Sequence, residues 1–233
     1  MVEPRSLRND RSIVPPRFGR SWGVRFCKSC FSNDRKEGLP LYWRRTHQLP
    51  GVVFCPWHEE LLWEIMNIRS HCCGFFPPED WSKFNAHEID LKLESMEKLS
   101  CLEMSTLSMF LLRNRITVFP HDVRQSFLQS VKKRSPYFAG ERCITCIGRL
   151  VRLCFGFEFL YWMRIVKNRN VTEWQVAGHL IQRAGPVPHQ LVIFAALENI
   201  IRKKPDILDD HHYRDIYSNP MMRRARSVVQ PLA

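Results

Sequence analysis

Four residues have the types and the spacing of a metal-binding set. Cys27 and Cys30 are separated by two residues, and Cys55 and His58 repeat the same gap further along the chain. Zinc binds thiolate sulfur and imidazole nitrogen in a tetrahedron, and a two-residue gap allows one tight turn to present both ligands of a pair. Because four protein ligands would fill the tetrahedron, the pattern predicts one structural zinc ion and no catalytic metal. The alternative is two unrelated cysteine pairs in a hydrophobic core.

Other cysteine and histidine residues are weaker candidates for metal ligands. Cys143 and Cys146 repeat the two-residue gap, but they fall on an expected helix without a later ligand pair, so we interpret them as core residues. The run 71–73, His-Cys-Cys, could supply a ligand in place of His58, and this alternative stays open. The run 209–212, Asp-Asp-His-His, lies in a polar stretch, which favours a solvated loop over metal catalysis.

The composition indicates a folded protein with an anionic partner. The 233 residues are 45% hydrophobic and 12% aromatic, which is enough to bury a core and excludes wholesale disorder. Lys and Arg number 35 and Asp and Glu number 23, so the formal net charge is +12. Such an excess favours nucleic acid or an acidic protein surface as the partner.

The sequence gives no support for several functional classes. It has no phosphate-binding loop, no nucleophile elbow and no spaced carboxylate triad, so it does not predict an enzyme. The most apolar long run, 150–166, contains Arg152, Glu158 and Arg164 and does not predict a membrane span. Nine cysteines in a chain without a recognisable export signal favour a reducing compartment.

The elements that would position these residues divide the chain into five stretches. They are a basic extended arm at 1–22, a zinc-binding module at 23–65, an irregular linker at 66–87, a helical domain at 88–204 and a polar, flexible tail at 205–233. Apolar residues at helical spacing predict a first helical stretch that begins at Glu88. They predict further helices at 122–133, 141–155, 158–166, 172–183 and 188–201. We therefore expect a mainly α protein in which a small CCCH zinc finger or zinc ribbon precedes a helical domain.

Two of these helices could form a DNA-binding helix-turn-helix. The helices at 122–133 and 141–155 are joined by a short turn, and the second helix of such a pair lies in the major groove. The alternative is an ordinary helical hairpin with a solvated basic face. The candidate DNA contacts are the basic residues of the second helix, of the end of the first helix and of the zinc module: Arg142, Arg149, Arg152, Lys132, Lys133, Arg134, Arg44 and Arg45.

The zinc module resembles a known family. The stretch 25–30 reads RFCKSC, the stretch 42–58 reads YWRRTHQLPGVVFCPWH, and Leu61 and Leu62 follow. This order is similar to the TniQ/TnsD family, whose pattern runs from an aromatic-C-P-x-C motif through Y-W-x-R-x-H-Q-x-P-G-V to C-P-x-H and a leucine pair. Lys28 stands where the family usually has proline. A second, more diffuse likeness covers the helices from 122 and the stretch 188–194.

The resemblance implies a function in bacterial transposition. Members of the family select target sites, so the chain is expected to be a non-enzymatic zinc-containing adaptor that binds double-stranded DNA and recruits an AAA+ ATPase and a transposase. The expected location is the bacterial cytoplasm, associated with the nucleoid, and a homodimer stays open. Only 26 residues precede Cys27, so we expect a short or truncated member. The alternatives are a zinc-stabilised protein-interaction module without direct DNA binding and an inactive remnant.

Overall fold

The structure is a computed structural model, and it is mainly helical with a small sheet near the N-terminus. It describes residues 23–65, 86–114, 120–138, 143–163, 165–166, 172–173, 176–177 and 188–214. The expected arm at 1–22, most of the expected linker and the run 71–73 lie outside these residues. Arg142, most of the expected helix at 172–183 and the stretch 215–233 also lie outside them.

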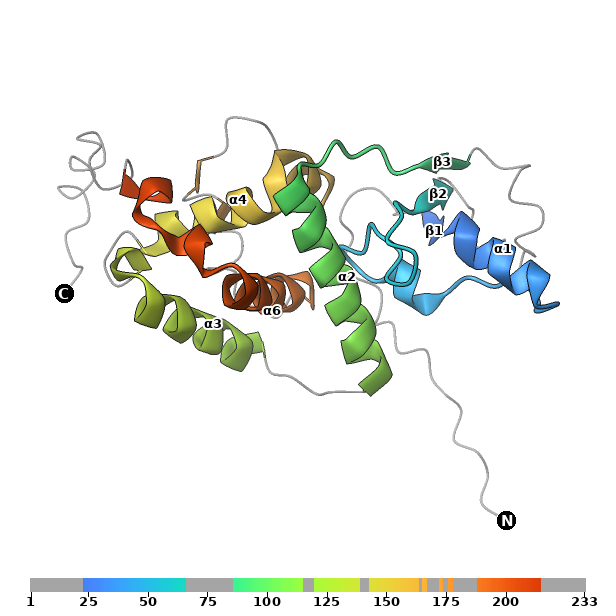
Figure 1. Cartoon of the computed structure of the whole chain (residues 1–233), viewed down its shortest axis with the longest axis horizontal. Coiled ribbons are helices and arrows are strands. Elements are labelled where there is room, and N and C mark those ends of the chain that lie inside the picture. The colour runs from blue at the N-terminus through green and yellow to red at the C-terminus, as the bar shows by residue number, and fades with distance from the viewer. Residues whose placement is uncertain are drawn as a thin grey trace, which may run out of the picture.

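Three short strands form an antiparallel sheet in the order β1-β2-β3. They are β1 (Val24–Phe26), β2 (Trp63–Ile65) and β3 (Ala86–Glu88), and in the centre of the sheet Arg25 pairs with Glu64, which pairs with His87. Helix α1 (Lys28–Lys36) follows β1 directly, and a 3₁₀ turn (Arg45–Gln48) packs against β1. In Figure 1, β1, α1 and the 3₁₀ turn are blue, β2 is teal and β3 is green.

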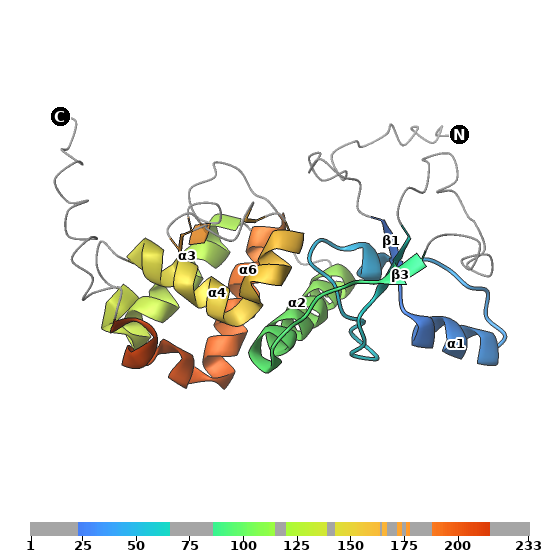
Figure 2. The same cartoon turned by 90° about the horizontal axis from the view of Figure 1, so that it is seen from above.

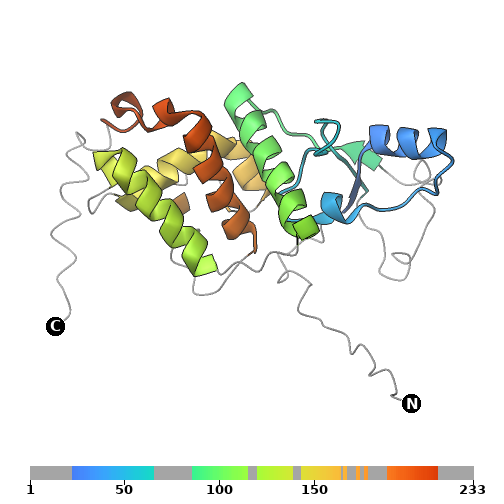
Figure 3. The same ribbon diagram turned by 60° about the horizontal axis from the view of Figure 1, so that its bottom comes forward.

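The remaining helices form a bundle that begins with α2. The four helices described there are α2 (Ser95–Asn114), α3 (Pro120–Arg134), α4 (Cys143–Trp162) and α6 (Pro188–Lys203). Helix α2 lies between the sheet region and the other helices in two perpendicular views (Figures 1 and 2). Helix α6 packs on both α2 and α3 and lies between them (Figure 3). The helices predicted at 122–133 and 188–201 therefore correspond to α3 and α6.

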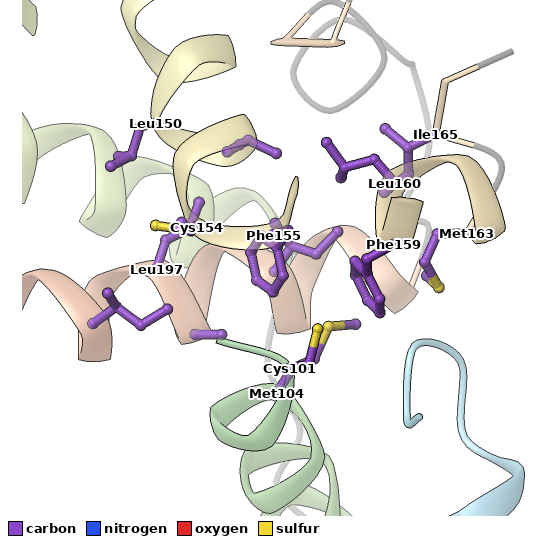
Figure 4. Close-up of a cluster of buried hydrophobic side chains, with 14 of the residues drawn as sticks. Cys101, Met104, Leu150, Cys154, Phe155, Phe159, Leu160, Met163, Ile165 and Leu197 are labelled. Carbon is purple, nitrogen blue, oxygen red and sulfur yellow. The ribbon is translucent and has the colours of Figure 1, made fainter. Parts of the chain in front are cut away.

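The core of the bundle continues into the N-terminal module at 23–65, which carries the four predicted metal ligands. Phe155, Phe159 and Leu160 of α4 are fully buried, and Cys101 and Met104 of α2 lie against them (Figure 4). The same hydrophobic cluster contains residues of the module, namely Cys27, Cys30, Val52, Val53, Phe54, Cys55 and Leu62. A second, smaller cluster packs α1 onto the sheet, where the rings of Phe26 and Phe31 stack with their centroids 5.0 Å apart.

Helix α4 joins two helices that the sequence predicts separately. A break was expected between 155 and 158, and the structure has a kink at Gly156, whose φ of 67° and ψ of 169° are not helical. This backbone conformation favours glycine, and a Cβ there would also push the carboxylate of Glu97 on α2 aside. The chain then continues helically to Trp162 in one kinked element.

The boundaries of two further stretches differ from expectation. Residues 86–88, expected at the junction of linker and helix, form strand β3, and α2 begins only at Ser95. Pairing with β2 explains this difference, because ladder hydrogen bonds form between strands that are distant in sequence. At the other end, Pro205–Leu208 forms a 3₁₀ turn in a stretch expected to be a flexible tail. Ile207, Leu208 and Tyr213 are buried there, and the Tyr213 hydroxyl donates to the Ile207 carbonyl at 3.1 Å.

None of the helices that the structure describes combines the length and the apolar character needed to cross a bilayer.

Candidate metal centre

The four predicted ligands come from two turns that face each other. Cys27 lies between β1 and α1 as the N-cap residue of the helix, and Cys30 lies one turn along α1. Cys55 and His58 lie in the turn that connects Phe54 to Leu61, two residues joined by an isolated antiparallel bridge. The sequence therefore predicts both halves of the site, and the fold brings them together.

The ligand atoms have the spacing of a tetrahedral site. Nδ1 of His58 lies 3.4 Å from Sγ of Cys27, 3.4 Å from Sγ of Cys30 and 3.5 Å from Sγ of Cys55. The sulfurs of Cys30 and Cys55 are 3.6 Å apart, and all four ligand atoms lie within 4.8 Å of one another. A tetrahedron with metal–sulfur bonds of ~2.3 Å and a metal–nitrogen bond of ~2.0 Å has edges of about 3.5–3.8 Å. The group therefore fits a metal ion.

Backbone hydrogen bonds shape both turns. The amide of Cys30 donates to Sγ of Cys27 at 3.3 Å, which is the capping interaction expected of a thiolate at a helix N-terminus. In the second turn the amide of Glu59 donates to the Cys55 carbonyl at 2.9 Å, and the amide of Cys55 donates to the Glu60 carbonyl at 2.8 Å. Glu59 has a φ of 55°, which turns the chain back immediately after His58.

The three thiols influence one another's ionisation. Hydrogen bonds from Cys27 and Cys30 lower the pKa of the Cys55 thiol to about 3. Hydrogen bonds with Cys27 and Cys55 raise the pKa of the Cys30 thiol, and burial adds to this shift. One thiolate therefore forms readily, whereas each further negative charge in the cluster is unfavourable without a cation. A divalent metal ion removes this penalty, because its ligands are thiolates.

Two further side chains surround the ligands and were not singled out from the sequence. Nε2 of His58 lies 3.1 Å from the side-chain amide of Asn33 on α1. The Asn33 atom that faces the ring is Nδ2, which donates to Nε2 when the proton is on Nδ1. With a metal ion at Nδ1, Nε2 would carry the proton and would donate to Oδ1 of Asn33 once the amide turns over. Glu60 accepts a hydrogen bond from the Ser29 hydroxyl, and its carboxylate lies 3.7 Å from Sγ of Cys27. Asn33 lies one helical turn beyond Cys30, which is the sequence signal that could have identified it.

A buried arginine holds the loop between the two ligand pairs. Arg25 is 2% exposed and donates to the carbonyls of Val52 at 2.6 Å and Leu49 at 3.0 Å. Gln48 adds two hydrogen bonds to the backbone of Arg25, at 3.1 and 2.6 Å. Burial lowers the pKa of Arg25 to about 10, and Glu64 opposes this shift. Arg25 thus anchors the loop, a role the sequence did not indicate.

His47 is fully buried beside this loop and is not part of the ligand group. Within the part of the chain that the structure describes, neither of its ring nitrogens has a hydrogen-bond partner, and its ring meets Trp57 edge-on with centroids 5.8 Å apart. Burial lowers the pKa of His47 to about 4. The sequence favours a hydrogen-bonded structural histidine at this position. The buried ring and its contact with Trp57 fit a structural role, but without the expected hydrogen bond.

The two arginines of the module have different environments. Arg44 forms a bidentate ion pair with Asp34 of α1, at 2.7 and 2.8 Å. Arg45, the next residue, is exposed. Arg44 is half-buried and Arg45 lies in the solvent. Their contact with DNA stays a prediction.

The candidate DNA contacts in the bundle are also unequal. Lys132, Lys133 and Arg134 are exposed at the C-terminal end of α3. Arg149 and Arg152 are half-buried on α4, and Arg152 pairs with Glu173 at 3.3 Å. Most of α4 is buried, so the helix that was expected to enter the major groove offers few exposed side chains. The helix-turn-helix stays a prediction.

Comparison with known proteins agrees with the module's sequence and geometry. The model of the TniQ family matches residues 1–62, and this segment includes all four residues of the candidate metal centre. No curated protein and no solved structure matches the chain significantly. A TniQ domain indicates a transposition-associated adaptor protein. The segment 1–62 is therefore similar to a TniQ domain.

Proposed function

We propose that the chain is a non-enzymatic adaptor in transposition, stabilised by one structural zinc ion held by Cys27, Cys30, Cys55 and His58. The observation that supports this proposal most directly is the TniQ match over the segment that contains the four-ligand cluster. Three sulfurs and one nitrogen at tetrahedral spacing favour zinc among common metals. Four protein ligands leave no position for a reacting water, which is why the proposed ion is structural.

The proposed adaptor binds duplex DNA through phosphate contacts. The formal net charge of +12 favours DNA, and Lys132, Lys133 and Arg134 present three exposed cations at one helix end. Arg149 and Arg152 lie on α4, the second helix of the proposed helix-turn-helix. They contribute less to DNA binding in this proposal, because both are half-buried. Phosphate contacts of this kind orient a protein on DNA but do not read its sequence.

The proposed partners follow from the family. An adaptor of the TniQ type connects a target site with the transposition machinery, so we propose that this chain recruits an AAA+ ATPase regulator and a transposase. The module and the bundle share one hydrophobic core, which gives such an adaptor a single rigid body.

DNA binding can be tested by titration at two salt concentrations. The test variant is Lys132→Ala/Lys133→Ala, and the control is Arg35→Ala/Lys36→Ala, which removes the same charge from the C-terminal end of α1. We expect the test variant to flatten the slope of log affinity against log salt by roughly 0.9 for each phosphate that it no longer neutralises, for all duplex sequences alike. Equal behaviour of the two variants would place the DNA-binding surface elsewhere. No salt-dependent binding by the wild type would favour the protein-interaction module instead.

A further inference from the structure

Three exposed aromatic side chains and two arginines form one surface between the metal-binding turn and α2. Tyr42, Trp57 and Phe110 are 52%, 42% and 50% exposed. The guanidinium of Arg44 lies 4.7 Å from the ring centroid of Tyr42 and 5.9 Å from that of Trp57. The guanidinium of Arg113 lies 5.7 Å from the centroid of Trp57, and Phe110 precedes Arg113 by one turn of α2. We call these five residues the aromatic stripe.

We propose that the aromatic stripe binds single-stranded nucleic acid by stacking unpaired bases. Every nucleotide of a single strand offers a planar π-face and a phosphate, and the stripe alternates aromatic rings with guanidinium groups. Stacking on Trp, Tyr or Phe tolerates all four bases, and arginine contributes through cation–π contact and phosphate pairing. A duplex does not offer this contact, because its base faces are covered by their neighbours. The stripe is therefore distinct from the phosphate-binding surface proposed at the end of α3.

The stripe is held in place before any ligand binds. Asp34 fixes Arg44 through two hydrogen bonds of 2.7 and 2.8 Å. The buried ring of His47 packs edge-on against the ring of Trp57. Trp57 itself lies in a tight turn, between the candidate metal ligands Cys55 and His58 in the sequence. Large exposed apolar side chains are normally scattered over a surface, so their concentration on preorganised supports indicates a binding site.

The charge around the stripe favours a nucleic acid over an acidic peptide. The ion pair with Asp34 offsets the charge of Arg44, which leaves that guanidinium as a planar stacking surface. Arg45 and Arg113 are exposed and remain available for phosphates. The surface thus offers more π-face than cationic charge, which matches stacked bases better than a run of carboxylates.

The test measures binding to the full chain by fluorescence anisotropy. One probe is a fluorescent oligo(dT) of about 20 nucleotides, which is long enough to span a site of this kind, and the other is a duplex of the same length. The main variant is Trp57→Ala, and Tyr161→Ala is the control, because Tyr161 is 53% exposed on α4 outside the stripe. Loss of one stacking partner should weaken oligo(dT) binding roughly five- to hundredfold. Trp57→Phe should retain most of the affinity. Duplex binding and zinc content should be unchanged in all three variants.

Two variants on α2 keep the test independent of the metal-binding turn. Phe110→Ala and Arg113→Ala should each weaken oligo(dT) binding even if Trp57→Ala disturbs the turn. Equal affinity of these variants, Trp57→Ala and wild type for oligo(dT) would overturn the proposal. So would a Trp57-dependent affinity for poly-glutamate that exceeds the affinity for oligo(dT), since the stripe would then be an acidic-peptide surface. If the wild type binds no duplex while the stripe variants still weaken oligo(dT) binding, the result counts against the α3 surface and supports the stripe.

Discussion

Three of the four ligands of the candidate metal centre are positioned by different neighbouring groups. The N-terminus of α1 faces Sγ of Cys27, the bridge between Phe54 and Leu61 closes the turn that holds Cys55, and Asn33 contacts the far nitrogen of His58. Arg25 then fixes the loop between the two ligand pairs from the inside. The ligand types could be predicted from a two-residue spacing, whereas these supporting contacts connect residues distant in sequence and needed the fold.

Replacing one ligand should remove the metal. We expect protein purified without added metal to contain close to one zinc per chain and Cys55→Ser to contain almost none, as measured by elemental analysis. The physical reason is that zinc binding by such ligand sets is worth roughly 10–16 kcal/mol in apparent free energy, most of which needs all four ligands. Cys143→Ser is the matched control, because Cys143 belongs to the other pair with a two-residue gap and lies on α4. A metal-free wild type that is equally folded would contradict the prediction.

Asn33→Ala should weaken metal binding without removing a ligand. Loss of an outer-shell partner of a metal-bound histidine typically costs roughly 10- to 100-fold in affinity, because the ring loses its orientation and its fixed tautomer. A chelator competition titration measures the change, and histidine ¹⁵N chemical shifts report the tautomer of His58. Asn33→Asp keeps an acceptor and should restore the affinity. The neighbouring Ser32→Ala is the control, and an equal affinity of Ser32→Ala and Asn33→Ala would rule out this role.

His47 should make the fold less stable as the pH falls. Its pKa is about 4 in the folded protein and about 6.5 when unfolded, so between these values the unfolded chain binds a proton that the folded chain does not. Stability contributed by the neutral ring is therefore complete above pH ~6.5 and declines by up to ~1.4 kcal/mol per pH unit toward pH 4. Urea unfolding with saturating zinc measures the free energy of unfolding at about pH 7 and about pH 5.5. This free energy should fall less between the two pH values for His47→Leu than for the wild type. An equal fall in both proteins would contradict the role given to His47.

At the scale of elements, the periodicity of apolar residues predicted helices, which depend on local sequence. It missed the strand that depends on pairing with a distant segment. The apolar spacing of α3 and α6 predicted both helices, and the gap between the helices expected at 141–155 and 158–166 falls at the kink of α4. Strand β3 has only three residues, and none of them is buried, so it has no apolar pattern that predicts a strand. Its pairing with β2 is what identifies it as one. Likewise, the stretch from 205 carries polar residues that suggest a tail, whereas Tyr213 is buried against Phe138 with ring centroids 5.2 Å apart.

The kink of α4 should be sensitive to substitution at Gly156. Its φ of 67° and ψ of 169° fall in a region that is essentially restricted to glycine, and a Cβ would displace the Glu97 side chain. We expect Gly156→Ala to lower the free energy of unfolding by roughly 1–3 kcal/mol, measured by urea denaturation. Gly38 has a φ of 67° with open space around it, so Gly38→Ala controls for a positive φ alone. A Gly156→Ala variant as stable as wild type would show that the kink relaxes freely.

At the scale of the whole molecule, the metal module and the helical bundle behave as one packed body. Cys27 and Cys55 belong to the same hydrophobic cluster as Phe155 and Leu197, so the boundary between module and bundle in the sequence is not a boundary in the core. Helix α2 lies between the two parts and packs against the 3₁₀ turn on one side and α4 on the other. A metal ion held by this group would therefore contact the same core that the helices share.

Removing the metal should consequently destabilise the entire fold in one step. At free zinc about a hundredfold above its Kd, binding contributes about 2.7 kcal/mol to stability, which for a chain of this size corresponds to a melting temperature roughly 5–10 °C higher. We expect chelator-treated protein to melt at this lower temperature with coincident transitions by far-UV circular dichroism, which reports the helices, and tryptophan fluorescence, which includes Trp57 beside the ligands. Re-addition of zinc should restore the higher melting temperature. If the fluorescence changed first while the helical signal kept its original midpoint, the module would unfold alone, and the shared core around Met104 and Phe54 would not couple the two parts.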